Sequence, residues 1–213
     1  MIGNLLIISS PSGGGKGTLI REVLQTTPDI TFSVSYTTRE MRKGEMDGRE
    51  YFFVSVEKFQ ELVAKDEFLE HAEVHGNFYG TSRSQVNELT RSGKDVLLEV
   101  DVQGAKDLLA KVPDAVSIFI LPPSFATLET RLRMRATESS GDLRVRLSNS
   151  FHEVREYDKF RFVVVNDDLE TAAEQIRTII NAERHRTNRQ DAAIQGILDG
   201  FDAAMHRFEK EPN

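Results

Sequence analysis

The sequence predicts an α/β fold, in which a parallel sheet is covered by helices on both faces and carries a small mixed-strand insert and a helical lid. Apolar runs of strand length occur at residues 5–8, 96–101, 116–121 and 162–165, and amphipathic helical patterns separate them. Strands without a polar face are typical of parallel sheets buried between helices. Because ligands bind at the carboxyl ends of such strands, we expect the functional residues at that edge.

The segment after the first apolar run is rich in glycine and leads directly into a helical pattern. It comprises Ser10, Pro11, Ser12, Gly13, Gly14, Gly15, Lys16, Gly17 and Thr18. The order of strand, glycine turn, lysine and helix is typical of the P-loop, whose backbone N–H groups and helix N-terminus bind phosphate. We therefore expect Lys16 near the β- and γ-phosphates of a nucleotide. The match is imperfect, because Gly17 replaces the hydroxyl residue of the consensus and Ser10 its first glycine; Thr18 could supply the hydroxyl instead.

The residues after the first helix predict a unit of short strands. Alternating polarity predicts a strand at residues 30–35, and apolar runs predict strands at 51–54 and 68–74. Ser55 is a suitable helix N-cap, and the residues behind it form an apolar stripe at helical spacing. Residues 34–90 are therefore interpreted as an insert within the larger α/β pattern.

The α/β pattern then resumes, and it predicts the remaining helices and the domain boundaries. Helices are predicted at about 84–93, 104–112 and 169–186, with Ser124 capping another helix. We assign residues 1–33 and 91–186 to the core, 125–157 to a lid within it, and 187–213 to a C-terminal helical tail. The sequence leaves open whether this tail docks on the domain or on a partner, so a homo-oligomer stays an alternative.

Composition limits the classes of function. The chain of 213 residues has a net charge of −7 and contains no cysteine. The acidic balance argues against binding of nucleic-acid polymers, and the lack of cysteine excludes disulfides, thiol catalysis and cysteine-ligated metals. The first residues show no cleavable leader and no run approaches a membrane span, so we expect a cytoplasmic protein without a membrane partner.

Arginines gather in the predicted lid, which is unexpected in an acidic protein. They are Arg131, Arg133, Arg135, Arg144 and Arg146. Phosphoryl transfer spreads negative charge over the transferred group, and arginines of a closing segment stabilise that charge. A solvated helical face would also carry arginines, but a phosphate loop in the same chain favours the functional interpretation.

A third group of polar residues lies in the predicted insert. Its members are Ser35, Arg39, Arg42, Tyr51, Glu70, Tyr79 and Thr81. Arg39 and Arg42 could grip a second phosphate, to which Tyr51 and Tyr79 could donate hydrogen bonds. The Glu70 carboxylate could accept from N1–H and N2–H₂ of guanine. An ordinary surface acid explains Glu70 equally well from its spacing alone.

Two acids lie near the carboxyl end of a predicted buried strand. Glu99 and Asp101 stand where an acid can reach the shell of a magnesium ion, and Asp101 fits better because Glu99 lies one pleat earlier. The alternative is a structural pair that caps neighbouring loops. The five histidines show no metal-ligand spacing.

Together these clusters resemble guanylate kinases, over residues 4–186. The motifs that carry the likeness are residues 10–16, Ser35-Tyr36-Thr37-Thr38-Arg39 with Arg42, Gly44-Glu45 and Tyr51, Phe68-Leu69-Glu70-His71-Ala72-Glu73, Gly76-Asn77-Phe78-Tyr79-Gly80-Thr81, Asp101-Val102-Gln103-Gly104, Leu121-Pro122-Pro123-Ser124, and Val165-Asn166-Asp167-Asp168.

The resemblance implies a core that binds ATP, an insert that binds GMP and a lid that closes over the phosphates. It implies a GMP site formed by Ser35, Arg39, Arg42, Tyr51, Glu70, Tyr79, Thr81 and Asp101. It implies catalytic roles for Lys16, Arg42, Arg135 and Arg146, and it adds Arg131 and Asn166 to the ATP-binding loop. Mg²⁺ is the implied cofactor; because Gly17 stands where serine is common, we expect phosphates and water to hold it, with Asp101 in the outer shell.

We therefore expect an ATP:GMP phosphotransferase that yields ADP and GDP without a covalent intermediate. The alternative is a non-catalytic guanylate-kinase-like module that binds phosphorylated peptides. Such modules usually have a degraded phosphate loop, whereas Lys16 and the lid arginines are present here. A kinase for another nucleoside monophosphate is a third alternative, against which only the resemblance at Glu70 and Asp101 argues.

Overall fold

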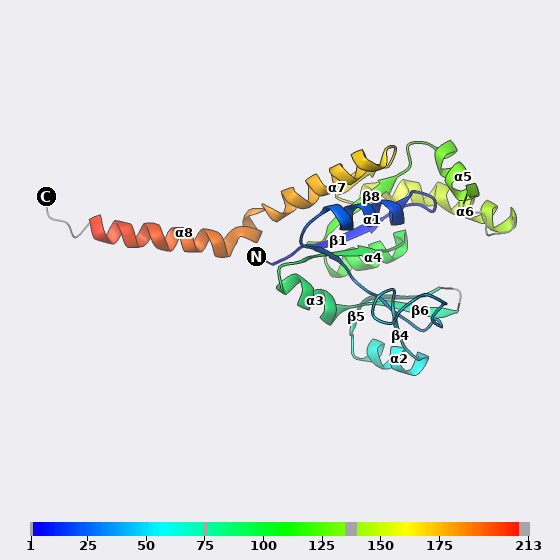
Figure 1. Ribbon diagram of the computed structural model, residues 1–213, viewed down its shortest axis with the longest axis horizontal. Coiled ribbons are helices and arrows are strands. Elements are labelled where there is room, and N and C mark those ends of the chain that lie inside the picture. The colour runs from blue at the N-terminus through cyan, green and yellow to red at the C-terminus, as the bar shows by residue number, and fades with distance from the viewer. Residues whose placement is uncertain (1, 75, 135–139, 209–213) are drawn as a thin grey trace.

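The computed structural model describes residues 2–74, 76–134 and 140–208, and two separate sheets organise it (Figure 1). The larger sheet has five strands in the order β2-β7-β1-β8-β9, and each neighbouring pair is parallel. The strands are β1 (Leu5–Ser9), β2 (Ile30–Phe32), β7 (Asp95–Glu99), β8 (Val116–Leu121) and β9 (Phe162–Val165). The predicted parallel sheet is confirmed, although β7 ends two residues before the predicted run does.

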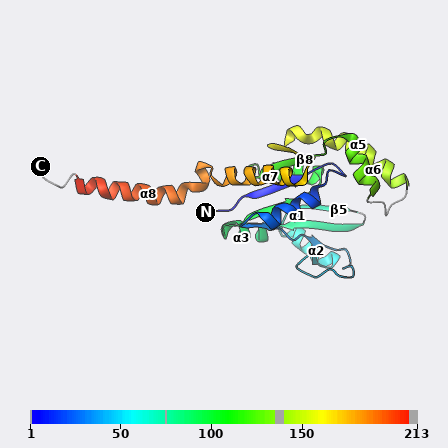
Figure 2. The same cartoon turned by 45° about the horizontal axis from the view of Figure 1, so that its top comes forward.

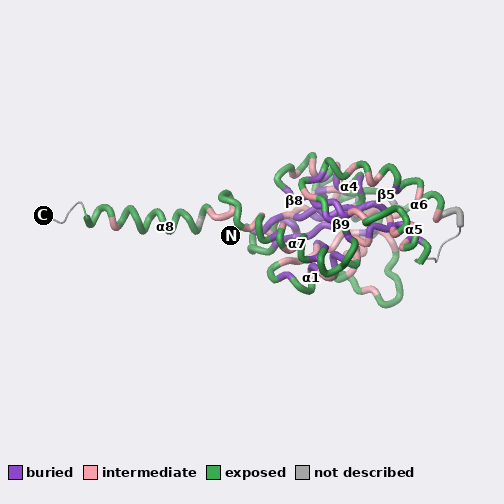
Figure 3. The backbone as a smooth tube through the Cα atoms, turned by 90° about the horizontal axis from the view of Figure 1, so that it is seen from above, coloured by how far each residue is buried: buried purple, intermediate pink, exposed green. Residues whose placement is uncertain are grey.

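Helices cover both faces of this sheet because its strands are apolar on both sides. The helices α1 (Lys16–Thr26) and α7 (Leu169–Arg184) lie on one face, and α3 (Arg83–Arg91) and α4 (Val102–Lys111) lie on the other. Along β1, Leu6 and Ile8 enter the first buried cluster, whereas Ile7 enters the second. Figure 3 shows the buried strands between these helical layers.

The smaller sheet is mixed, as predicted, with strands in the order β4-β3-β6-β5. Strand β3 pairs in parallel with β4 and antiparallel with β6. Phe59 of the adjoining helix stacks on two rings of this sheet, at centroid distances of 4.6 Å to Phe68 and 5.5 Å to Phe78. The elements are β3 (Tyr36–Thr37), β4 (Phe52–Phe53), α2 (Val56–Ala64), β5 (Phe68–Val74) and β6 (Asn77–Ser82).

The chain between β8 and β9 forms the region predicted as a lid. It contains α5 (Phe125–Met134), α6 (Ser140–Glu153) and the 3-10 helix η1 (Val154–Lys159). Leu128 and Leu132 are buried, and the rings of Phe125 and Phe151 stack at 5.0 Å. These helices lie at the opposite end of the molecule from the C-terminal helix (Figure 2).

The last described helix, α8 (Thr187–Phe208), projects from the body instead of packing on it (Figures 1 and 2). Its predecessor α7 ends at Arg184, two residues earlier than the sequence predicted. No helix in the described ranges is long and apolar enough to span a membrane.

Candidate active site

The loop between β1 and α1 adopts the backbone that its glycines predict. Gly13 and Gly15 have φ angles of +84° and +85°, a region that other residues rarely adopt. A Cβ atom on Gly15 would lie 2.4 Å from Nδ2 of Asn166, and one on Gly13 would lie 2.9 Å from Cγ of Leu132. Both positions therefore need glycine for the backbone angle and for the space.

Two predicted ATP-binding residues hold this loop from outside. The Nδ2 atom of Asn166, at the end of β9, donates to the Gly14 carbonyl over 3.0 Å. Arg131 of α5 donates to the Asn166 carbonyl (2.9 Å) and to the Gly14 carbonyl (3.3 Å). A cleft of about 280 Å³ opens beside them. Its lining residues are Gly13, Gly15, Thr18, Arg131, Met134, Asn166, Asp167 and Leu169.

Lys16 begins α1 and turns toward the carboxyl end of β7. Its Nζ atom donates to the Val100 carbonyl over 2.6 Å and lies 3.8 Å from Oε1 of Glu99. Burial lowers the pKa of Lys16, and the charges of Glu99, Asp101 and Glu153 oppose this shift. A second cleft, of about 250 Å³, contains the amine. It is lined by residues 10–17, Glu99, Asp101 and Glu153.

The two acids at the carboxyl end of β7 face different neighbours. Oε1 of Glu99 would lie 3.9 Å from a Cβ atom on Gly17, so this acid faces the phosphate loop. Asp101 is the N-cap of α4 rather than a strand residue, and its Oδ1 atom accepts from the Gly104 amide over 2.7 Å. The structural capping role that the sequence left open thus applies to Asp101, because a free helix N-terminus needs an acceptor.

The basic loop of the smaller sheet is organised by an acid. Glu45 accepts from Nη2 of Arg39 over 2.8 Å and 3.0 Å, and from the backbone N–H of Arg42 over 2.7 Å. The Arg39 hydrogen bond, followed by that of the Arg42 backbone, lowers the pKa of Glu45. Glu45 therefore holds the guanidinium of Arg39 and the backbone of Arg42 in one loop.

Aromatic rings complete this part of the site. The Arg39 guanidinium lies 5.5 Å from the ring centroid of Tyr51, and the rings of Tyr51 and Tyr79 meet edge to face at 5.8 Å. Burial raises the pKa of the Tyr51 hydroxyl further above neutral pH, where the group is protonated and can donate a hydrogen bond. Ser35 precedes β3, and its backbone carbonyl accepts from the Phe52 amide over 2.9 Å.

Glu70 stands opposite Thr81 in the pairing of β5 with β6. The Thr81 hydroxyl donates to Oε1 of Glu70 over 2.7 Å. Burial is the main cause of the raised pKa of Glu70; the Thr81 hydrogen bond opposes it, and the charge of Asp101 adds to it. A Cβ atom on Gly104 would lie 3.2 Å from Oδ1 of Asp101 and 3.9 Å from Oε2 of Glu70, which places both acids around one backbone position.

Comparisons with known proteins show the family of this chain. The sequence model of the guanylate kinase family matches residues 2–183. The chain belongs to the guanylate kinase family.

Curated guanylate kinases resemble the chain over most of its length. The enzymes of Nitrosospira multiformis and Escherichia coli K12 are each 46% identical, covering 92% of this chain and 93% and 98% of their own. The crystal structure of guanylate kinase from Anaplasma phagocytophilum has a TM-score of 0.69 at 38% identity, covering 88% of this chain and 89% of that one. Guanylate kinases are ATP:GMP phosphotransferases, so membership supports a catalytic function and not the peptide-binding alternative.

The structure describes two of the three predicted catalytic arginines. Arg135 lies outside the described residues. Arg146 is half-buried on α6, and Arg42 is exposed beside Glu45. The roles of all three stay predictions.

Glu153 is a site residue that the sequence pattern does not indicate. Its Oε2 atom accepts from the backbone N–H of Ser12 over 2.9 Å, across 141 residues of sequence. Because Glu153 ends α6, the phosphate loop is in direct contact with the region predicted as a lid. An acid at the end of a helix is too common a pattern to indicate such a contact.

Proposed function

We propose that the kinase binds ATP over the β1–α1 loop and GMP on the smaller sheet, and that Mg²⁺ assists the transfer. The observation that carries this proposal is the short segment Glu99–Val100–Asp101. Lys16 donates to the carbonyl of Val100, and Asp101 lies beside the backbone position that Glu70 also approaches. Three consecutive residues thus connect the phosphate loop with the acid expected to read guanine.

Glu70 is suited to guanine because its ionised carboxylate has acceptors only. N1–H and N2–H₂ of guanine are adjacent donors, and the Thr81 hydroxyl occupies only one lone pair of Oε1. Arg39, Arg42, Tyr51 and Tyr79 would hold the phosphate, with Ser35 at the edge of the same sheet. In this arrangement the base and the phosphate of GMP bind residues from different strands, which fixes the orientation of the acceptor oxygen.

Phosphoryl transfer needs charge and positioning rather than a nucleophile of the protein. Lys16 would shift from the Val100 carbonyl to the phosphates of ATP. Arg42, Arg135 and Arg146 would add positive charge around the transferred group. Asp101 would hold the start of α4 in place beside Glu70, because its carboxylate caps that helix.

Magnesium fits this site only as an ion shared with the nucleotide. Within the described ranges, no group of three or more acids or histidines could hold a metal alone. Mg²⁺ typically keeps several waters and binds through one or two carboxylates plus substrate phosphates. When bound, it would supply positive charge that offsets the negative charge of the nucleotide phosphates. Asp101 was the predicted outer-shell acid, but Glu99 faces the loop more directly and is the better candidate.

The proposed substrates indicate the cellular location and the binding partners of the kinase. ATP and GMP are the proposed ligands, and a cytoplasmic location would give access to both. The net charge of −7 is consistent with small nucleotides bound by clustered cations rather than a nucleic-acid polymer or membrane surface.

The test is ADP formation from ATP and Mg²⁺ with GMP, AMP, UMP or CMP supplied in parallel. Strong turnover with GMP alone supports the proposal. Turnover with another monophosphate would retain the phosphate loop but overturn the assignment of Glu70. Absence of turnover in folded protein that binds nucleotide would overturn the phosphotransferase itself.

A further inference from the structure

The first half of the phosphate loop is a β-turn. The Gly14 amide donates to the Pro11 carbonyl over 2.9 Å, and Gly13, the third residue of the turn, has a φ angle of +84°. A positive φ at this position is typical of a type II turn. The turn uses the N–H of its last residue, so the N–H of Ser12, its second residue, needs an acceptor from another part of the protein or from water.

Glu153 supplies this acceptor. Its Oε2 atom accepts from the Ser12 amide over 2.9 Å, and its side chain lines the same cleft as Lys16. A carboxylate forms a shorter and stronger hydrogen bond with a backbone N–H than a neutral acceptor does. Glu153 is the last residue of α6, at the point where the chain passes into η1. The turn is therefore tied to the region predicted as a lid.

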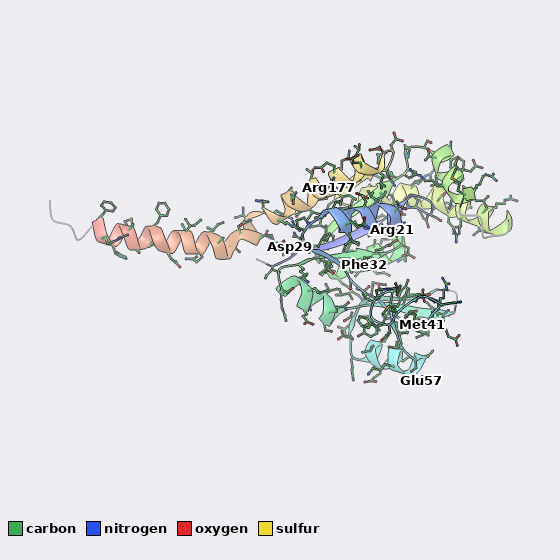
Figure 4. The ribbon with its side chains drawn as sticks, in the orientation of Figure 1. Arg21, Asp29, Phe32, Met41, Glu57 and Arg177 are labelled. Carbon is green, nitrogen blue, oxygen red and sulfur yellow. The ribbon has the colours of Figure 1, made fainter. Side chains whose placement is uncertain are left out.

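The helix α5 of the same region holds the turn from another direction. Arg131 donates to the Gly14 carbonyl over 3.3 Å, and a Cβ atom on Gly13 would lie 2.9 Å from Cγ of Leu132. Figure 4 shows α5 and α6 beside the loop end of α1, the helix on which Arg21 is labelled. Two helices thus fix three consecutive loop residues, α5 through a carbonyl and close packing and α6 through an amide.

The charge of Glu153 has two opposing effects in this place. It strengthens the hydrogen bond to the Ser12 amide, but a carboxylate that lines a cleft for phosphates also repels an anionic ligand. A glutamine at the same position would keep an acceptor and remove the repulsion. Comparison of glutamine with alanine therefore separates the hydrogen bond from the charge.

We propose that Glu153 is a positioning residue for phosphoryl transfer, which acts through the Ser12 amide. The transfer depends on donors held where negative charge develops, and here these donors are the loop amides and Lys16. Glycines leave a loop many backbone conformations, so a fixed turn reduces the ordering that ATP must otherwise impose. This role rests on the proposed binding of ATP over the β1–α1 loop.

An alternative is that Glu153 occupies a phosphate position in the loop and is displaced by ATP. The position of its partner argues against this interpretation. The helix N-terminus, where phosphate is expected, begins with Gly15 as the N-cap and Lys16 as the first helical residue. The Ser12 amide belongs to the preceding turn, so the acid holds the loop beside the helix N-terminus rather than on it.

The test compares kcat and the KM for GMP of the natural chain and its variants at saturating ATP. Glu153→Ala removes the acceptor, and we expect kcat to fall about tenfold or more while the KM for GMP is unchanged. Glu153→Gln keeps an acceptor, and we expect kcat within about threefold of the natural value. Far-ultraviolet circular dichroism checks that each variant is folded.

Glu156→Ala is the matched control, and we expect its kcat to equal that of the natural chain. Glu156 lies three residues further along and pairs with Lys106 of α4 over 2.7 Å. It therefore also ties the lid region to the core, but through α4 instead of the loop. Partly exposed ion pairs contribute little to stability, so the fold should tolerate this change.

A double-mutant cycle tests whether the acid acts through the Ser12 amide. Ser12→Pro removes that N–H, and proline is favoured at the second position of this turn type. In the Ser12→Pro background, Glu153→Ala should change kcat by less than about twofold, because the hydrogen bond is already absent.

Several results would overturn the proposal. Normal kcat in Glu153→Ala would show that the turn needs no acceptor from α6. Tighter ATP binding with undiminished turnover in that variant would identify Glu153 as an occupant of the phosphate site. An equal loss in Glu153→Gln would assign the effect to the charge, and an equal loss in Glu156→Ala would assign it to a loosened lid region. Effects that multiply in the cycle would show that the acid does not act through the amide.

The same assay separates this role from the proposed function. A natural chain without GMP-dependent turnover would overturn both. An active natural chain that gives any of the contrary results above would overturn the role of Glu153 alone.

Discussion

Glu70→Gln should weaken the use of GMP while leaving ATP binding unchanged. The glutamine amide keeps one acceptor but turns a donor toward the two donors of guanine, and the negative charge is lost. Hydrogen bonds to charged groups contribute about 1.5–3 kcal/mol, so kcat/KM for GMP should fall about 10- to 100-fold. Thr81 keeps its hydrogen-bond acceptor in the variant, so the strand pairing of β5 with β6 should survive.

The assay is steady-state ADP formation with GMP varied at saturating ATP, and then with ATP varied at saturating GMP. Glu73→Gln is the matched control, because Glu73 lies exposed on the same strand. Its constants should equal those of the natural chain. Equal losses for ATP and GMP in Glu70→Gln, or no loss for GMP, would refute the guanine-reading role.

The pH dependence follows from the raised pKa of Glu70. The carboxylate must be ionised to accept from guanine, so KM for GMP should rise as the pH falls through that raised pKa, at a higher pH than for an exposed glutamate. A raised folded-state pKa also means that folding favours the protonated form and that this stabilisation is lost as the pH rises. Glu70→Gln should therefore remove the acidic rise in KM and unfold at neutral pH at an equal or higher temperature. An acidic rise that persists in the variant would assign it to another group.

Three further predictions concern the loop and the core. Lys16→Ala should lower kcat at least about a hundredfold while GMP binding largely survives; near-normal turnover would contradict the assigned role. Gly15→Ala should lose most ATP affinity, measured by titration, whereas Gly17→Ala, with only one distant neighbour, should bind ATP normally; equal effects would contradict the steric argument. Arg184→Ala should lower the free energy of unfolding in urea by about 2 kcal/mol, because buried Asp95 loses a charged donor; unchanged stability would show that the pair contributes nothing.

The sequence was informative where local chemistry decides the structure. Glycines before Lys16 predict a loop that only glycine can form, and Gly13 and Gly15 do have left-handed φ angles. Apolar strands predict the parallel sheet, whose carboxyl edge collects Asn166 and Glu99 as expected. In these cases the residue types alone restrict the backbone angles of the loop and the kind of sheet that can form.

The contacts that the sequence did not predict join distant segments or depend on backbone atoms. Glu153 meets Ser12, and Lys16 donates to the carbonyl of Val100 rather than to a side chain. A carbonyl has no sequence signal, and an acid at a helix end is compatible with many partners. Asp101 was expected on a strand, but its carboxylate caps α4, a choice that depends on where β7 stops.

The most direct test of phosphoryl transfer between the two sites follows the γ-phosphoryl group itself. The kinase is incubated with GMP, Mg²⁺ and ATP labelled at the γ-phosphate, and the products are separated after acid quenching. We expect label in the β-phosphate of GDP in equal amount to ADP, with none on the protein. Label in inorganic phosphate, or retained on the protein, would contradict direct transfer between two sites that meet at the end of β7.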